Sequence, residues 1–195
     1  MKRTLAVGVV SLCVVLAGWA CSRPGSTATN PQTNSSQSAA GEVHFQAPDG
    51  WTTEKPTSSM RVAQYKLPKA EGDNDDAILV LYYFGATQGG TAQANIDRWI
   101  GQMKQTDGSD SKSKAKTESM TVNGLNVSTV DVTGVYTAEM APGSQTFHND
   151  ADYRLRAAVI ETPKGNYFVK LAGPVKTIAR WDKEYNDYLK SFEFK

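Results

Sequence analysis

The sequence predicts an α+β domain in which an antiparallel sheet of about seven strands carries helices on its faces. Two observations predict this class. Strand-like segments follow one another through short turn signals, as in hairpins, and two longer segments carry apolar residues at helical spacing. Consecutive strands with only a few helices are typical of α+β domains. We expect the domain to span residues 41–195.

Three strands are predicted in the first part of the domain. Apolar and polar residues alternate over 43–47, as expected for a strand with one solvated face. After turns, a second strand spans 61–67. The third segment, 77–84, is apolar at every position, so we expect a central strand that is covered on both faces.

A first helix is predicted over 92–105. Its apolar residues recur at intervals of three and four, and Thr91 precedes them as a candidate N-cap. The polar stretch 106–116 contains glycine and is expected to form an exposed loop.

A hairpin is predicted next, with the Asn-Gly signal of residues 123–124 between its strands. The first of these strands ends near Val122, and the second spans 125–136. Apolar residues change parity along the second strand, and we expect a β-bulge near Ser128 to reconcile them.

The last part of the domain is predicted to hold a loop, a second hairpin and a closing helix. Residues 137–152 are expected to form an irregular loop, and strands 153–162 and 166–172 are joined by a tight turn. Residues 175–192 are predicted to form one continuous amphipathic helix. Its apolar stripe consists of Ile178, Trp181, Tyr185, Tyr188, Leu189 and Phe192.

The N-terminal residues 1–20 have the layout of a secretory signal, because two cations precede an uncharged, largely apolar run. The run is shorter than the roughly 20 residues that span a bilayer core. The segment resembles the signal peptide of bacterial lipoproteins, whose lipobox ends in a cysteine. The box here reads LAGWAC and departs from the usual pattern at Gly18 and Trp19.

The lipoprotein resemblance implies that Cys21 carries lipid and that the chain is cut just before it. The protein would then be anchored outside the cytoplasm, in the cell membrane or the outer membrane. An ordinary secreted protein that is cut nearby is the alternative. Residues 21–40 are expected to form a flexible tether, because they lack the apolar side chains that offset the entropy of ordering. Such a tether reaches about 24 Å on average.

Composition excludes several classes of function. Loss of Lys2 and Arg3 with the signal reduces 21 cations to 19, against 20 acidic residues. With a formal charge of −1 and no block of like charge, we expect no nucleic-acid partner. Cys13 would leave with the signal and Cys21 would carry lipid, so no thiol remains for a disulfide, thiol catalysis or a Cys-rich zinc site. No cofactor is expected.

The order of features over 43–194 resembles the PsbP-like family. The shared features are an early Pro-Asp-Gly-Trp, the strand, loop and helix of 77–105, and a closing helix that ends Leu-Lys-Ser-Phe. The family includes an extrinsic photosystem subunit, a nuclear-import accessory factor that binds a small GTPase, and DcrB-type bacterial lipoproteins. The resemblance implies an α/β/α sandwich and an accessory binding role, and it carries no catalytic motif.

Asp131 is the acidic residue that we single out, because it lies within a predicted strand that is otherwise neutral. Arg154 and Arg156 lie on one face of another predicted strand and can pair with it. Two interpretations are open. The three residues form the polar floor of a ligand pocket, or they form a structural ion pair at a sheet edge.

A metal site and a hydrolase site have weaker support. His148, Asp150 and Asp152 alternate and would face one way in an extended chain, but no fourth ligand is identifiable and a solvated loop is the simpler interpretation. A hydrolase needs His44 or His148 beside an activated serine. Ser144 lacks the nucleophile-elbow context.

These observations predict a membrane-anchored extracytoplasmic lipoprotein that acts as a non-enzymatic accessory module. Its partners would be the membrane, through lipid on Cys21, and an unidentified protein. The alternative is a periplasmic carrier of a small molecule or metal ion, with a pocket near Asp131.

Overall fold

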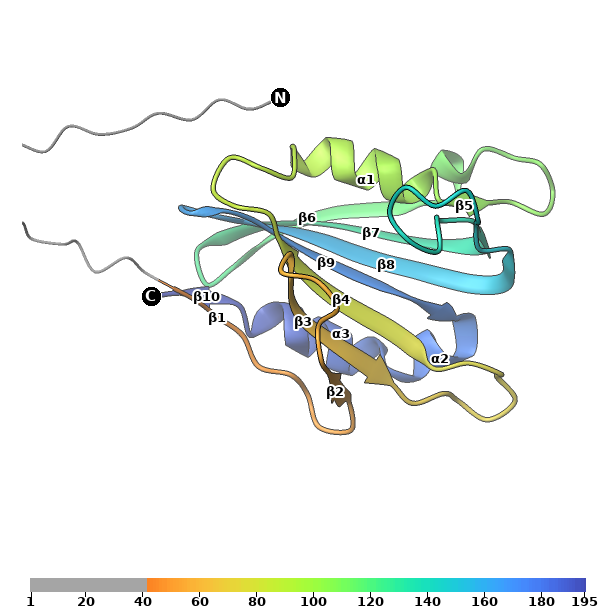
Figure 1. Cartoon of the computed structure of the whole chain (residues 1–195), viewed down its shortest axis with the longest axis horizontal. Helices are drawn as coiled ribbons and strands as arrows, with labels where there is room; N and C mark the ends of the chain where they lie inside the picture. Colours follow the sequence, from red (N-terminus) through yellow and green to blue (C-terminus); the bar gives the residue numbers. More distant parts are fainter. Residues whose placement is uncertain (1–41) are drawn as a thin grey trace, which may run out of the picture. The chain divides into compact units, whose positions relative to one another are not determined.

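An eight-stranded antiparallel sheet organises residues 42–195, the part of the chain that the computed structural model describes (Figure 1). The strand order is β2-β3-β4-β9-β8-β7-β5, and β6 also pairs with β7. The predicted signal peptide and tether lie outside the described residues. The strands of the sheet are β2 (Thr52–Glu54), β3 (Arg61–Leu67), β4 (Ala77–Tyr83), β5 (Met103–Lys104), β6 (Lys116–Val122), β7 (Leu125–Tyr136), β8 (Asp150–Thr162) and β9 (Gly165–Pro174).

The first predicted strand is shorter than expected and belongs to a separate ribbon. β1 (Val43–His44) pairs only with β10 (Glu193–Phe194), close to the end of the chain. The predicted strand 61–67 is confirmed as β3. The predicted central strand is also confirmed, because β4 lies between β3 and β9 and has buried residues on both faces.

The first helix, α1 (Ala92–Ile100), begins as predicted but ends five residues early. The Thr91 side chain accepts a hydrogen bond from the backbone N–H of Ala94, which confirms the N-cap. Gly101 ends the helix, and the chain then extends so that β5 can pair with β7. The predicted loop after it contains the short 3-10 helix η1 (Ser111–Ser113).

The predicted β-bulge near Ser128 is wrong. The register between β7 and β8 is continuous past this residue, and it shifts only between Gly134 and Tyr136. The parity change has a different cause. Val127 is buried in the core on one side of the sheet, whereas Val130 is buried on the other side. The strand therefore exchanges its buried face along its length.

The Asn-Gly turn before β7 is confirmed. Asn123 and Gly124 both have positive φ angles, 47° and 84°. This is the conformation that a two-residue type I′ hairpin requires.

The closing helix is broken in two, which the sequence did not predict. α2 (Val175–Arg180) and α3 (Asp182–Lys190) meet at Trp181, whose φ and ψ are −103° and 14°. The Trp181 indole N–H donates to the carbonyl of Pro68 at 2.9 Å. Trp181 as a whole is 9% exposed. The helix is therefore interrupted at the residue whose ring is anchored in the core.

Two hydrophobic cores lie on the two sides of the sheet. One contains apolar residues of α2, α3 and the sheet, including Ile178, Tyr188 and Leu171. The other contains α1 residues such as Trp99 together with Leu155 of β8. Figure 1 shows α1 on one side of the sheet and α2 and α3 on the other. No helix within residues 42–195 is long and apolar enough to cross a membrane.

Candidate functional site

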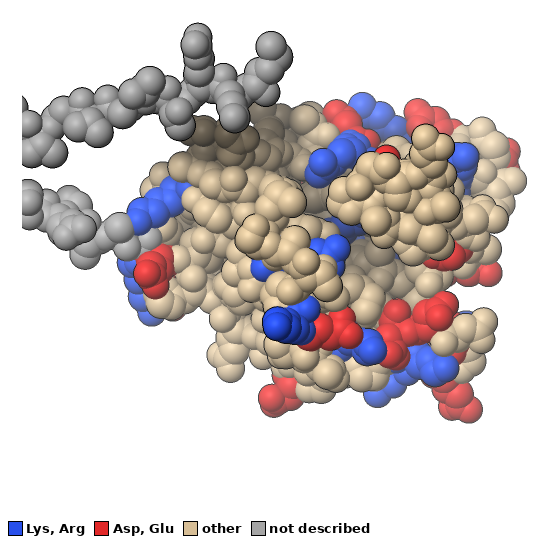
Figure 2. All heavy atoms as spheres, in the orientation of Figure 1, with Lys and Arg blue, Asp and Glu red and all other residues tan. Residues whose placement is uncertain are grey.

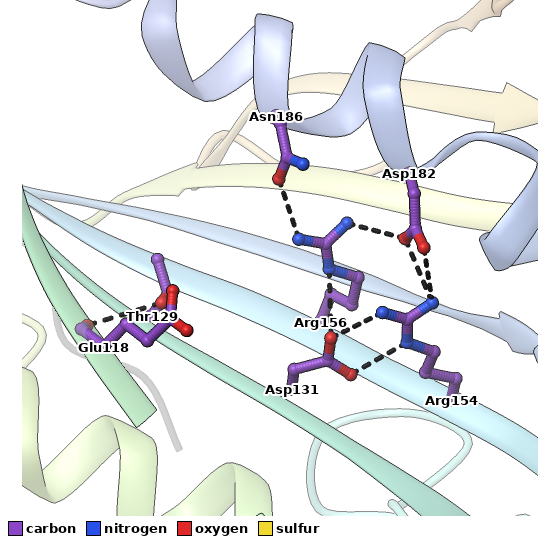
Figure 3. Close-up of polar contacts among 7 residues, drawn as sticks. All are labelled: Glu118, Thr129, Asp131, Arg154, Arg156, Asp182 and Asn186. Atoms are coloured by element: carbon purple, nitrogen blue, oxygen red, sulfur yellow. Dashed lines mark hydrogen bonds and ion pairs between the residues drawn. The ribbon is translucent and has the colours of Figure 1, made fainter. Parts of the chain in front are cut away.

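The predicted Asp131 group exists, and it extends to α3 (Figure 3). Asp131 on β7 is paired directly with Arg156 on β8, and Arg154 lies two residues earlier on the same face of β8. Two residues of α3, one turn apart, complete the group. We call it the Arg154 cluster, and its members are Asp131, Arg154, Arg156, Asp182 and Asn186.

Arg154 joins two carboxylates from different elements. Its Nε and Nη2 donate to the two oxygens of Asp131, at 2.8 and 2.5 Å. Its Nη1 lies 3.0 Å from both oxygens of Asp182. The hydrogen bonds to Asp131 are the main cause that raises the pKa of Arg154 above its already high value, against the effect of burial. The guanidinium therefore stays charged and clamps the start of α3 to the sheet.

Arg156 supports the same contact. Its Nη1 donates to Asp182 and its Nη2 to Asn186, both at 2.8 Å. Its guanidinium carbon lies 4.2 Å from the centre of the Tyr185 ring, within the range of a cation–π interaction. Both arginine side chains are largely buried, at 16% and 14% exposed.

The contacts of the Arg154 cluster favour a structural role. Two cations face two carboxylates, so the charge is balanced within the protein. Two surface hollows, of about 430 and 350 Å³, are lined by other residues. The ion-pair interpretation accounts for the charges of this group, and a ligand pocket over Asp131 stays a prediction.

Tyr185 carries a buried hydroxyl next to this cluster. The hydroxyl has no hydrogen-bond partner among the described residues. Burial raises the pKa of Tyr185 above its usual range, although the charge of Arg156 acts in the opposite direction. The ring contacts Arg156, so the ring rather than the hydroxyl stabilises the cluster.

Replacing Tyr185 with phenylalanine is expected to leave the free energy of unfolding unchanged or to raise it by up to about 1 kcal/mol, because an unpaired buried hydroxyl is lost. Urea denaturation of the full chain and of the Tyr185→Phe variant measures this difference. A loss of more than about 1 kcal/mol would show that the hydroxyl has a partner that stabilises it.

The three candidate metal ligands do not converge. The Nδ1 atom of His148 lies 2.7 Å from a carboxylate oxygen of Asp150. Asp152 has a positive φ of 55°, which interrupts the extended alternation that the sequence suggested. Within residues 42–195, no group of three or more His, Cys, Asp or Glu side chains is arranged to hold a metal ion.

Neither histidine forms the contact that a serine hydrolase needs. Asp150 is the hydrogen-bond partner of His148, and the His44 side chain is exposed on the short strand β1. The Ser144 hydroxyl is bonded to Thr146 within its own loop. Among the described residues, no histidine is hydrogen-bonded to a serine hydroxyl.

The loop 137–149 between β7 and β8 has the most exposed apolar side chains of the described residues. Met140 is 61% exposed and Phe147 is 56% exposed. The loop is nevertheless ordered by backbone hydrogen bonds, from Met140 to Thr146 and from His148 to Ala138. Met140 and Phe147 are therefore the candidate contact residues of the described surface.

The sequence missed part of both features. The sequence alone does not connect Asp182 and Asn186 with Asp131, although their spacing of four places them on one face of a helix. For Met140 and Phe147 the sequence offers no comparable signal, since exposure of an apolar residue in a loop depends on the tertiary structure.

Comparisons with known proteins give no family assignment. No family model matches the chain, and no curated protein matches it. The similar solved structures include two at 14% sequence identity. One is a Pseudomonas aeruginosa protein of unknown function, with a TM-score of 0.44 over 72% of this chain and 94% of that chain. The other is CyanoP, the cyanobacterial PsbP of Synechocystis sp. PCC 6803, with a TM-score of 0.45 over 78% of this chain and 86% of that chain.

The described residues define an α+β protein with a mainly antiparallel sheet and three α-helices. Membership of the PsbP-like family stays a prediction from the sequence.

Proposed function

We propose that this chain is a lipid-anchored, extracytoplasmic accessory protein that binds a protein partner and catalyses no reaction. In this proposal Cys21 carries the lipid, residues 22–40 act as a tether, and the rest is a PsbP-like α/β/α domain. Two or three acyl chains hold a membrane stably where a single chain is marginal. A tether then keeps the domain close to the membrane, where weak contacts suffice.

The observation that most supports a binding role is the pair of exposed apolar side chains, Met140 and Phe147, on an ordered loop. The position of this loop also fits a tethered protein. Glu42 and Lys195 are hydrogen-bonded through their backbones, so the chain enters the domain beside its C-terminus. Asn123, at the start of the β6–β7 turn, bonds to the carbonyl of Phe192 at that same end.

From this turn β7 runs for 12 residues to the other end of the sheet. At about 3.3 Å per residue, it carries the loop 137–149 about 40 Å away from the Asn123 turn and the end of the domain where Glu42 lies. The apolar loop therefore lies at the end of the sheet opposite to Glu42, and its side chains are exposed to a partner there.

Site-specific photo-cross-linking in the protein's own cells tests this proposal. A photoreactive amino acid at Phe147 or Met140 is expected to give a discrete adduct with one protein. The matched control is Met120, which is 37% exposed on the edge strand β6. It should give at most a small fraction of that adduct. Absence of adducts at both loop positions, or equal adducts at Met120, would contradict a docking role for the loop.

A further inference from the structure

The side of the sheet that carries α1 is covered unevenly. The helix packs over β7 and β8, where Ile96 and Trp99 meet Val130 and Leu155. In Figure 1, no helix lies over β3 and β4 on this side. Figure 2 looks onto this side and shows Lys and Arg atoms among uncharged ones below α1. We call this region the open sheet face. Its central residues are Gln64, Val80, Tyr82 and Lys170, which lie on adjacent strands β3, β4 and β9.

Lys170 is the unusual residue of the open sheet face, because it is partly buried without an acidic partner. Its Nζ donates to Gln102 Oε1 at 2.6 Å and lies 5.2 Å from the centre of the Tyr136 ring. An ammonium group has three donors. One hydrogen bond to Gln102 therefore leaves donors that can bind an additional acceptor.

Two further cations border the same region. Arg98 is exposed on α1, where it donates to Asn95. Arg61 on β3 lies with its guanidinium carbon 5.7 Å from the centre of the Tyr82 ring. Among the described residues, no carboxylate lies within 4.0 Å of the charged groups of Arg61, Arg98 or Lys170.

Glu54, at the far edge of the same side, does not compensate for these cations. Its carboxylate is engaged by Lys66 at 3.4 Å and by Gln64 at 2.7 Å. The open sheet face thus combines cations that lack a carboxylate partner with the partly exposed aromatic ring of Tyr82. The Arg154 cluster is the opposite case, since each of its cations meets a carboxylate.

The protonation of Lys170 reflects this lack of a partner. Burial, with a contribution from the charge of Arg98, lowers the pKa of Lys170 from 10.5 to about 8. The ring of Tyr136 faces Lys170, and around Tyr136 lie the phenols of Tyr82 and Tyr153, the carboxylate of Asp150 and the ring of His148. No carboxylate contributes to the shift. A bound anion would supply the missing charge and raise this pKa again.

From the unpaired cations around a partly apolar floor, we infer that the open sheet face binds a small organic molecule with one carboxylate or phosphate group on an apolar body. The oxyanion contacts Lys170 and Arg98, and the apolar body lies on the partly exposed ring of Tyr82. Aromatic floors and a few placed polar groups are the usual features of small-molecule sites. This site is separate from the loop surface of the proposed function and does not depend on it.

NMR titration of the full chain with 13C-labelled lysine side chains tests the inference. The probes are phenyl phosphate and benzoate, which carry an oxyanion and a ring, with inorganic phosphate and benzyl alcohol as the two incomplete probes. We expect saturable shifts of the Lys170 signal with both complete probes and weaker binding of both incomplete ones. Bound phenyl phosphate should also raise the pKa of Lys170, a readout that needs no variant.

Lys170→Met, which keeps the length of the aliphatic stem, is expected to weaken phenyl phosphate binding about 10-fold or more. The control Lys176→Met, on the exposed surface of α2, should bind as the natural chain does. The inference is overturned if neither complete probe binds saturably, if benzyl alcohol binds as tightly as phenyl phosphate, or if Lys170→Met binds phenyl phosphate unchanged. Each of these results would leave the cross-linking at Phe147 unaffected.

Discussion

Replacing Arg154 with methionine is expected to lower the free energy of unfolding by about 2 to 4 kcal/mol. The side chain is 16% exposed and bonds to two carboxylates, Asp131 and Asp182. Its loss leaves two acidic groups that face only Arg156. Removal of one partner from a fully buried pair costs about 3 to 5 kcal/mol. We expect a smaller value because Asp182 is 41% exposed.

Urea denaturation of the full chain at pH 7 measures this loss, with Lys183→Met as the matched control. Lys183 also forms an ion pair on α3, with Asp187, but it is 81% exposed. The control should leave the free energy of unfolding nearly unchanged, because an exposed ion pair is weak. If Arg154→Met loses no more than the control, the Arg154 cluster does not clamp α3 to the sheet.

Replacing Lys170 with methionine is expected to have the opposite effect on stability. It should raise the free energy of unfolding at pH 7 by about 2 kcal/mol. The pKa of Lys170 is lowered from 10.5 to about 8 in the folded state. Below pH 8 the folded protein therefore carries a buried charge without a counterion. Each pKa unit corresponds to about 1.4 kcal/mol, and loss of the hydrogen bond to Gln102 offsets part of the gain.

The same pKa predicts how stability changes with pH. Between pH 8 and 10.5 the unfolded chain binds the Lys170 proton and the folded chain releases it, so stability rises with pH. From pH 7 to 9.5 we expect a rise of about 2 kcal/mol. Above pH 10 the trend should reverse, because burial raises the pKa of Tyr185 and Tyr188 and the folded state retains their protons.

Urea denaturation of the natural chain and of Lys170→Met at several pH values from 7 to 9.5 measures this effect. The variant should show no comparable rise. A natural chain whose stability is flat over this interval would mean that Lys170 is solvated or paired. Taken together, the two substitutions distinguish a cation that stabilises the fold from one that the fold carries at a cost. Such a cost is common where a residue serves binding.

Much of the fold was predictable because the pattern of apolar residues along the sequence agrees with the residues that are buried in the structure. The apolar run of β4, the N-cap at Thr91 and the Asn-Gly turn each depend on residues close in sequence. Three errors have a tertiary origin. The helix after Thr91 stops at Gly101, where β5 joins the sheet. The closing helix breaks at Trp181, whose indole bonds to Pro68.

The third error shows how parity can mislead. A change of apolar phase in β7 suggested a bulge, but the strand is buried on one face at Val127 and on the other at Val130. Two helical layers that cover different halves of a sheet produce such a pattern without any irregularity. A sequence does not reveal which half of a strand each layer covers.

The candidate sites were predictable to different degrees. The prediction that Asp131 lies beside Arg154 and Arg156 is confirmed. A charged side chain within a strand is stabilised when it pairs with a residue of opposite charge on a neighbouring strand. Lys170 offered a weaker signal, a cation on the alternate face of an otherwise apolar strand. Its lack of an acidic partner depends on the elements packed around it, β4, β7 and the end of α1, which the sequence does not reveal.

The intact mass of the full chain, extracted in detergent from its own cells, tests the central claim most directly. If the protein is anchored as proposed, the natural chain begins at Cys21 and its mass includes acyl chains. The mass of a Cys21→Ser variant includes no acyl chains. A chain that retains residues 1–20, or an unmodified Cys21, would contradict the anchor on which the proposed function depends.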